Sequence, residues 1–306
     1  MKKLRKFFIA TFFAVHPFVF FSCSDIPISS GPILPEMELV YGRTIAESEE
    51  DGVFIDGRTV TLGNFWMGIY EVTQAEYESV MKNQTVEIAE EEYVLNSNPS
   101  KNTEQNLATD EVQKNRPVEN ISWYDAVYYC NALSNKTGKK CAYKIEIEEI
   151  DRTGSITSAQ VELDITANGY RLPTEAEWEF AARGGGLVAS TDWSYKYSGS
   201  NKIDSVCWAY FNSSKKSHQI GLKSPNRLGL YDMSGNVAEW CHDFYHYISP
   251  TEETNPTGTL HGNFKVFRGG SFASPSEDCT VSKRDYTEPA STSTKIGFRV
   301  VRTVKN

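Results

Sequence analysis

The sequence predicts an α+β domain in which short helices and strands alternate with long loops. Three segments carry a Ser or Thr followed three residues later by Glu or Asp, the pattern that caps a helix N-terminus. Short runs of alternating apolar and polar residues predict strands. The 306 residues suffice for one large domain or two small ones, and because no internal repeat is visible, we expect a single domain.

Residues 1–22 predict an export signal. A basic start, residues 2–6, precedes the apolar run 7–21, which is too short for a membrane-spanning helix. Cys23 lies where this run turns polar, which resembles a bacterial lipoprotein signal with Cys23 as the lipidated residue. The alternatives are an ordinary secretory signal and an uncleaved anchor. We therefore expect a protein of the bacterial cell envelope, held to the membrane through Cys23 on the outer surface or the periplasmic face.

Residues 23–52 are rich in Pro, Ser, Gly and acidic side chains, which predicts a flexible tether. The folded domain is expected from Val53 to Arg302. The formal net charge of -9 argues against a nucleic acid, or an anionic membrane bound by charge, as partner.

The first half of the domain contains two predicted helices. Residues 53–66 predict two strands around an Asp56–Gly57 turn, and a helix follows over 70–82, capped by Thr73. Residues 83–115 are polar and predict a loop. The next helix starts at Ser122 and presents Cys130 on its apolar face, as a core residue. An exposed β-ribbon is expected over residues 145–165.

The second half combines one helix with long loops. That helix begins at Thr174 and ends at Gly184. Nearby, Arg171 and Trp178 either line a site or serve the core, with Arg171 paired to a carboxylate. Residues 192–226 predict an ordered loop packed by aromatic side chains, namely Trp193, Trp208, Tyr210 and Phe211. Two strands, 266–272 and 296–301, are expected to bracket the polar loop 273–295.

The segment 229–243 combines a turn with a carboxylate on either side. Its Ser, Gly and Asn residues favour a tight turn, and Asp232 and Glu239 flank it. Exposed carbonyls and carboxylates are the hard oxygen ligands that Ca²⁺ prefers. The alternative is an ordinary turn that Glu239 stabilises through backbone hydrogen bonds.

Six motifs in a fixed order identify a resemblance. The chain is similar to the formylglycine-generating enzyme (sulfatase-modifying factor) family over Val53 to Arg302. The motifs are YEVTQAEY at 70–77, VENISWYDAVYYCNALSNKTG at 118–138, YRLPTEAEWEFAARGGG at 170–186, GLYDMSGNVAEW at 229–240, FRGGSF at 267–272 and IGFRVVR at 296–302. The resemblance implies one C-type-lectin-like α+β domain with little regular secondary structure.

The resemblance also implies a structural Ca²⁺ ion at the turn. The implied ligands are the side chains of Asp232 and Glu239 and the carbonyls of Met233, Gly235 and Val237. A second calcium site of the family uses an Asn after an aromatic–Ala pair, where this chain reads Trp208–Ala209–Tyr210. We do not expect that second site.

The family's oxidase chemistry requires two cysteines that bind Cu(I), a metal that prefers soft thiolates. Cys279 matches the second cysteine, but Ser274 stands in place of the first. Ser271 matches a serine of the peptide groove, and Ala238 replaces a groove tryptophan. Copper is therefore not expected, and Cys279 is interpreted as a buried structural cysteine or a disulfide partner, with Cys241 as one candidate.

Two functions remain open. The first is a lipid-anchored, non-catalytic scaffold that binds a protein or peptide ligand through loop 273–295, which resembles the variable region of retroelement-diversified lectin-type proteins. The second is a formylglycine-generating oxidase or another modifying enzyme for exported substrates. His242 and His246, four residues apart, would face one side of a helix and hold a metal, or else are two solvated histidines.

Overall fold

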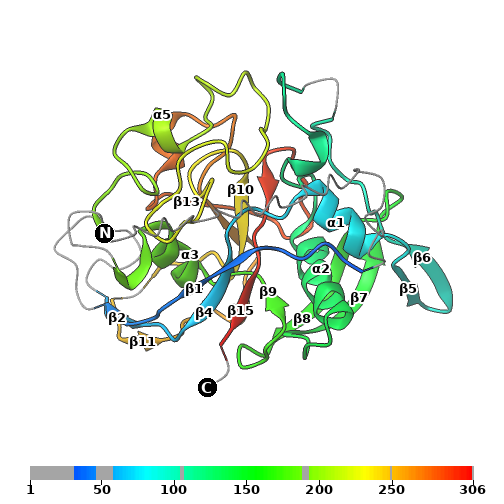
Figure 1. Ribbon diagram of the computed structural model, residues 1–306. Helices are drawn as coiled ribbons and strands as arrows, with labels where there is room; N and C mark the ends of the chain where they lie inside the picture. The colour runs from blue at the N-terminus through cyan, green and yellow to red at the C-terminus, as the bar shows by residue number, and fades with distance from the viewer. Residues whose placement is uncertain (1–30, 46–57, 104–106, 188–192, 249, 305–306) are drawn as a thin grey trace, which may run out of the picture. The chain divides into compact units, whose positions relative to one another are not determined.

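The computed structural model describes residues 31–45, 58–103, 107–187, 193–248 and 250–304 (Figure 1). The helices are α1 Gln74–Met81, α2 Trp123–Lys136, α3 Glu175–Ala182 and α5 Ile203–Val206. Short 3-10 turns are η2 Gln113–Asn115, η3 Gly185–Leu187 and η4 Ser276–Cys279. Within these ranges, we find no helix long and apolar enough to cross a membrane.

Two four-stranded sheets organise the domain. The first has the order β1-β4-β15-β9 and the second β13-β12-β10-β14. The strands of the first are β1 Met37–Val40, β4 Phe65–Gly68, β15 Val301–Thr303 and β9 Tyr170–Arg171. Those of the second are β13 Arg284–Thr287, β12 Lys265–Arg268, β10 Ala238–Phe244 and β14 Ile296–Gly297.

The N-terminal strand corrects the expected tether. β1 pairs antiparallel with β4, which also pairs with β15 near the C-terminus, so the two ends of the described chain share one sheet (Figure 1). Val40 and Ile45 are buried. The domain thus includes residues 31–45. Residues 37–40 add a strand to the first sheet, and residues 44–45 add a strand to the three-stranded sheet described next.

A third sheet has the order β11-β3-β2, formed by β11 Glu253–Thr254, β3 Val60–Thr61 and β2 Thr44–Ile45. The first strand of the hairpin predicted over 53–66 and its expected turn, Asp56–Gly57, lie outside the described residues. After that turn, the one strand that was expected is divided into β3 in this sheet and β4 in the first sheet.

Two hairpins complete the strands. β7 Tyr143–Ile150 and β8 Ile156–Leu163 form the ribbon expected over 145–165. β5 Thr85–Ile88 and β6 Glu91–Val94 form a second hairpin within the segment predicted as loop, and it projects beside β7 in Figure 1. Its turn uses Ala89 and Glu90 at positive φ, 51° and 70°. Neither is a usual turn residue, which explains why no hairpin was expected here.

The three predicted helix starts are confirmed. Thr73, Ser122 and Thr174 each accept a hydrogen bond from the third helical residue, whose carboxylate bonds back to the cap. Gly184, at φ 95°, follows the C-cap residue Arg183.

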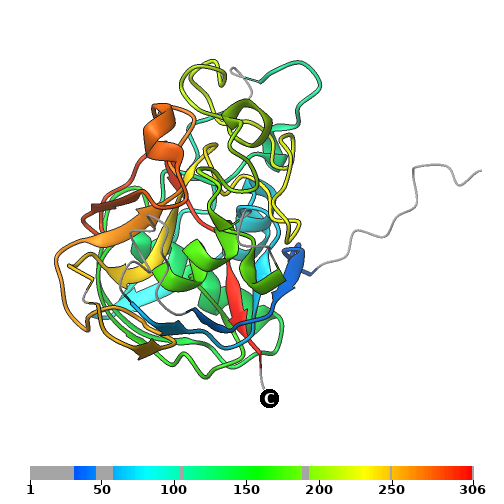
Figure 2. The same cartoon turned by 90° about the vertical axis from the view of Figure 1, so that its left-hand side faces the viewer.

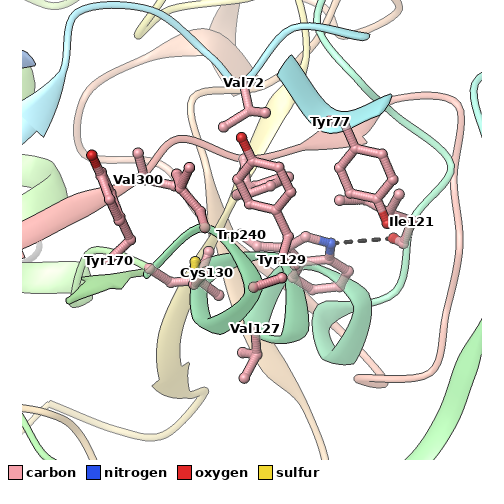
Figure 3. Close-up of a cluster of buried hydrophobic side chains, with 14 of the residues drawn as sticks. Val72, Tyr77, Ile121, Val127, Tyr129, Cys130, Tyr170, Trp240 and Val300 are labelled. Carbon is pink, nitrogen blue, oxygen red and sulfur yellow. Dashed lines mark hydrogen bonds between the residues drawn. The ribbon is translucent and has the colours of Figure 1, made fainter. Parts of the chain in front are cut away.

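The first half of the core surrounds α2. Tyr77 of α1 stacks on Tyr129 of α2 with ring centroids 5.3 Å apart. Figure 3 shows the indole of Trp240 beneath them, donating to the carbonyl of Ile121 at 3.4 Å. Cys130 is fully buried in the same cluster, as predicted.

The second half of the core surrounds α3, all of whose residues are buried. Its three glutamates are paired with arginines, since a buried charge without a partner is costly. Arg171 donates a bidentate pair of hydrogen bonds to Glu177, at 2.6 and 2.7 Å. Arg171 is therefore a core residue paired with a carboxylate. Trp178 is also a core residue and donates to Glu239 at 2.7 Å.

The prediction that four aromatic side chains pack residues 192–226 is wrong for two of them. Trp193 is buried, but Tyr210 and Phe211 are 57% and 51% exposed.

Candidate functional site

A pocket of about 230 Å³ opens between the second sheet and loop 273–295. Ala238 of β10 and Phe267 of β12 line it from the sheet, and η4 and β13 line it from the loop. Figure 2 shows β12 and β13 side by side, with β13 as the outer strand. The residues that line the pocket are Ala238, Phe267, Arg268, Gly269, Gly270, Ser271, Ser274, Asp278, Lys283, Asp285, Ser293, Lys295 and Ile296.

Two glycines form the turn from the sheet into the pocket wall. Gly269 and Gly270 have φ of 90° and 68°, values that L side chains rarely adopt. A Cβ on Gly270 would lie 2.6 Å from the carbonyl oxygen of Asp278 and 2.9 Å from the Cys279 sulfur. The turn thus brings η4 against the end of β12.

The serines after these glycines bond to each other. Ser274 Oγ accepts from the Ser271 amide at 3.0 Å and lies 3.2 Å from Ser271 Oγ. Both line the pocket, whereas Cys279 is fully buried and does not. The position that the family's first cysteine would occupy therefore faces the pocket with a hydroxyl, and the matching second thiol lies behind the wall.

Charged residues of both signs surround the pocket. Lys283 pairs with Asp278 at 3.0 Å, and Asp285 and Lys295 are exposed. Sequence reasoning named the loop but none of these side chains, because charges in a polar loop carry no periodic signal. Ala238, where the resemblance implies a tryptophan, contributes only a methyl group to the pocket lining.

A buried carboxylate cluster lies at the predicted calcium turn. Glu239 accepts from Arg299 on both oxygens, at 2.6 and 2.7 Å, and from Trp178. Asp232 Oδ2 accepts from the Gly221 amide at 2.7 Å. Glu71, which sequence reasoning missed, accepts from Asn236 Nδ2 at 2.7 Å and from the Val237 amide at 3.0 Å.

Burial and mutual repulsion shift the titration of this cluster. Burial raises the pKa of Asp232 to about 6. Burial, with Asp232 and Glu239 nearby, raises the pKa of Glu71 well above its usual value. Excess negative charge in a buried place favours a cation.

The implied calcium ligands fit this geometry only in part. Asp232 Oδ1 is buried and accepts no hydrogen bond from the described residues, so this oxygen is available as a metal ligand. Both oxygens of Glu239 are engaged by Arg299, so a calcium ion there would share that carboxylate with a guanidinium. Met233, Gly235 and Val237 lie on the same turn, and the calcium site stays a prediction.

The histidine pair does not form a metal site on a helix. His242 lies in strand β10, half-buried beside the rings of Trp123 and Tyr143, and desolvation lowers its pKa well below the usual value. Nδ1 of His246 contacts the carbonyl of Phe244 at 3.0 Å. The two histidines therefore do not share one face of a helix, and no group of three or more His, Cys, Asp or Glu able to hold a metal occurs in the described ranges. Cys23 lies outside them.

Comparison with known proteins gives the family. Residues 32–304 match the Sulfatase-modifying factor enzyme 1-like domain. The chain is 32% identical over 284 residues to the chaperone protein LppX of Paenibacillus barcinonensis, covering 87% of this chain and 89% of that protein. It is 37% identical over 84 residues to the formylglycine-generating enzyme of Thermomonospora curvata, covering 25% of this chain and 28% of that enzyme.

Solved structures agree with this fold. The structure of Treponema denticola variable protein 1 aligns with a TM-score of 0.75 and 32% identity, over 91% of this chain and all of that one. CarF aligns with a TM-score of 0.64 and 26% identity, over 89% of this chain and 99% of that one. The predicted C-type-lectin-like α+β fold is confirmed.

Proposed function

Because the chain belongs to the sulfatase-modifying factor family, we propose that it is an exported, lipid-anchored protein that binds a protein or peptide ligand and does not generate formylglycine. The pocket between the second sheet and loop 273–295 is the binding site. The observation that carries the proposal is the hydroxyl of Ser274 on the pocket wall, with Cys279 buried behind it.

Catalysis by oxidation would require thiols within reach of a substrate. The pocket offers none, since its lining includes no cysteine. A serine hydroxyl is a poor ligand for Cu(I) and forms no redox disulfide.

We call the charged lining residues Asp278, Lys283, Asp285 and Lys295 the rim of the pocket. The rim favours a ligand that carries charges of both signs. On it, Asp285 and Lys295 are exposed, and Lys283 forms an ion pair with Asp278. A polypeptide meets this pattern with side chains and backbone dipoles. Loops on a rigid scaffold can carry binding residues that vary without loss of stability, and the chain shares its fold with Treponema denticola variable protein 1.

Formylglycine production is the first test. The full chain would be incubated with Cu(I), O₂ and a Cys-x-Pro-x-Arg peptide, with and without Ca²⁺, and analysed by mass spectrometry. We expect no product from protein whose circular dichroism and cooperative melting show that it is folded. Product that disappears in Cys279→Ala would overturn the proposal in favour of an oxidase.

Ligand binding is tested by charge reversal on the rim. Peptides selected from a displayed random library against the wild-type chain should bind Lys295→Glu at least tenfold more weakly. The matched control is Lys82→Glu, an exposed lysine at the end of α1, away from the pocket. Equal loss in both variants, or none in either, would place the ligand elsewhere.

Membrane attachment is tested at Cys23. Expressed in a bacterial host, the wild-type chain should enter the detergent phase and carry a diacylated N-terminal peptide. Cys23→Ser should remain in the aqueous phase. A soluble wild-type chain cleaved elsewhere would favour the ordinary secretory signal.

A further inference from the structure

Two segments far apart in the sequence lie together behind the pocket. The amide of Tyr210 donates to the carbonyl of Ser274 at 3.0 Å. The hydroxyl of Ser213 donates to the carbonyl of Phe272 at 2.7 Å. These bonds fasten the segment after α5 to the start of loop 273–295, and each segment carries one cysteine.

Those cysteines, Cys207 and Cys279, share one small buried cluster with Tyr197, Val206 and Ala209. Both are fully buried. The Cys279 thiol, followed by burial, raises the pKa of Cys207 far above its ordinary value. Both thiols are free in this structure. They lie in one cluster, on segments that the Tyr210 and Ser213 hydrogen bonds hold together.

Glycines provide the space that this sulfur pair needs. A Cβ on Gly235 would lie 2.5 Å from the Cys207 sulfur, and one on Gly270 would lie 2.9 Å from the Cys279 sulfur. Real Cβ atoms essentially never come within 3.0 Å. Two turns without side chains thus let the thiols approach from opposite segments.

The other described cysteines have different surroundings. Cys130 belongs to the core around α2, and Cys241 to the core around α3. Cys141 contacts Asn135 at 3.1 Å. Cys241, which the sequence suggested as a partner of Cys279, is therefore not its neighbour.

We propose that Cys207 and Cys279 form a disulfide bond that joins loop 273–295 to the segment after α5. Two S–H bonds break and one S–S bond forms, and two electrons and two protons pass to an oxidised disulfide donor, which becomes a dithiol. The thiolate is the reacting form, so the bond forms during folding, before burial suppresses ionisation of the thiols. The result is a covalent anchor for the pocket wall on the side away from the ligand.

The test uses the reduced, denatured full chain, refolded in detergent with oxidised and reduced glutathione. Free thiols are then alkylated and the protein is digested with trypsin without reduction. Cleavage separates peptide 203–215, which carries Cys207, from peptide 269–283, which carries Cys279. We expect one linked species containing both peptides. Alkylation of both thiols, or linkage of Cys279 to Cys241, overturns the proposal.

Melting temperature supplies a second readout that does not depend on digestion. The oxidised wild-type chain should melt roughly 10 °C above the same protein after reduction. Cys207→Ala and Cys279→Ala should each remove this difference, whereas the control Cys241→Ala should keep it. If the oxidised and reduced forms of Cys207→Ala still differ in melting temperature by this amount, the assignment is overturned, even where the variant is less stable overall.

Discussion

Two cations line the same pocket in opposite circumstances. Arg268 is buried and donates to Glu175, Glu179 and the carbonyl of Val281, each at 2.6 Å. Lys283 keeps 41% of its side chain exposed and has Asp278 as its ion-pair partner. Arg268 fixes the second sheet to α3, whereas Lys283 lies on the rim of the pocket. The comparison separates the residues that build the pocket from those that its opening exposes to solvent.

The largest effect is expected from Arg268→Met, because it removes a guanidinium shared by two buried glutamates and leaves Glu175 with Arg284 alone and Glu179 with Arg183 alone. Removing one partner of a buried ion pair costs about 3–5 kcal/mol. The free energy of unfolding from urea titration measures it. A loss below about 1 kcal/mol would mean that Arg268 belongs with the rim.

A smaller loss is expected from Trp178→Phe. The indole nitrogen donates to Glu239 at 2.7 Å in the core, and phenylalanine removes that donor. A hydrogen bond to a charged buried group contributes about 2–3 kcal/mol. Urea titration of both proteins checks the value, and an unchanged midpoint would show that Arg299 satisfies Glu239 alone.

Asp232→Asn tests the carboxylate cluster through pH. The pKa of Asp232 is about 6 in the folded chain and near 3.8 in the unfolded one. Between these values the folded state binds more protons, so this carboxyl lowers wild-type stability as pH rises from about 4 to 6. Without Ca²⁺, the Asn variant should gain on the order of 2 kcal/mol over the wild type across this window. Asn also accepts the φ of 57° at this position.

Added Ca²⁺ sharpens the same experiment. An ion held by Asp232 would stabilise the wild type at pH 7 and leave the Asn variant unchanged. Equal melting temperatures in calcium and in chelator, for both proteins, would remove Asp232 from any calcium site.

Lys283→Met should change stability least. Exposed ion pairs contribute between about 0 and 1 kcal/mol. The substitution matches Arg268→Met in chemistry, so the two urea titrations form one comparison. A loss as large as that of Arg268→Met would show that Lys283 is a structural residue.

The sequence predicted best what is encoded locally. Thr73, Ser122 and Thr174 cap their helices within three residues, so each start was visible. Ser271 and Ser274, which the resemblance singled out, both line the pocket. The resemblance therefore named two residues of the candidate site, and local capping patterns named the helix starts.

What the sequence did not show depends on distant contacts. Glu71 meets Asn236 across 165 positions, and no local pattern marks it as buried. The pairing of β1 with β4 is equally non-local, which is why residues 31–45 were predicted as tether. Cys207 lies in a loop without periodicity, so its nearness to Cys279 emerged only in three dimensions.

The pleat of β13 divides the loop's residues into two groups with different evolutionary freedom. Lys283 and Asp285 face the pocket. Between and after them, Arg284 bonds to Glu175 at 2.6 Å and Tyr286 stacks on Tyr245 with centroids 4.0 Å apart. Alternate codons of this stretch thus specify the lining of the pocket and the packing of the strand. A lineage that altered every second codon here would change the charges that line the pocket and keep the contacts that hold its wall in place.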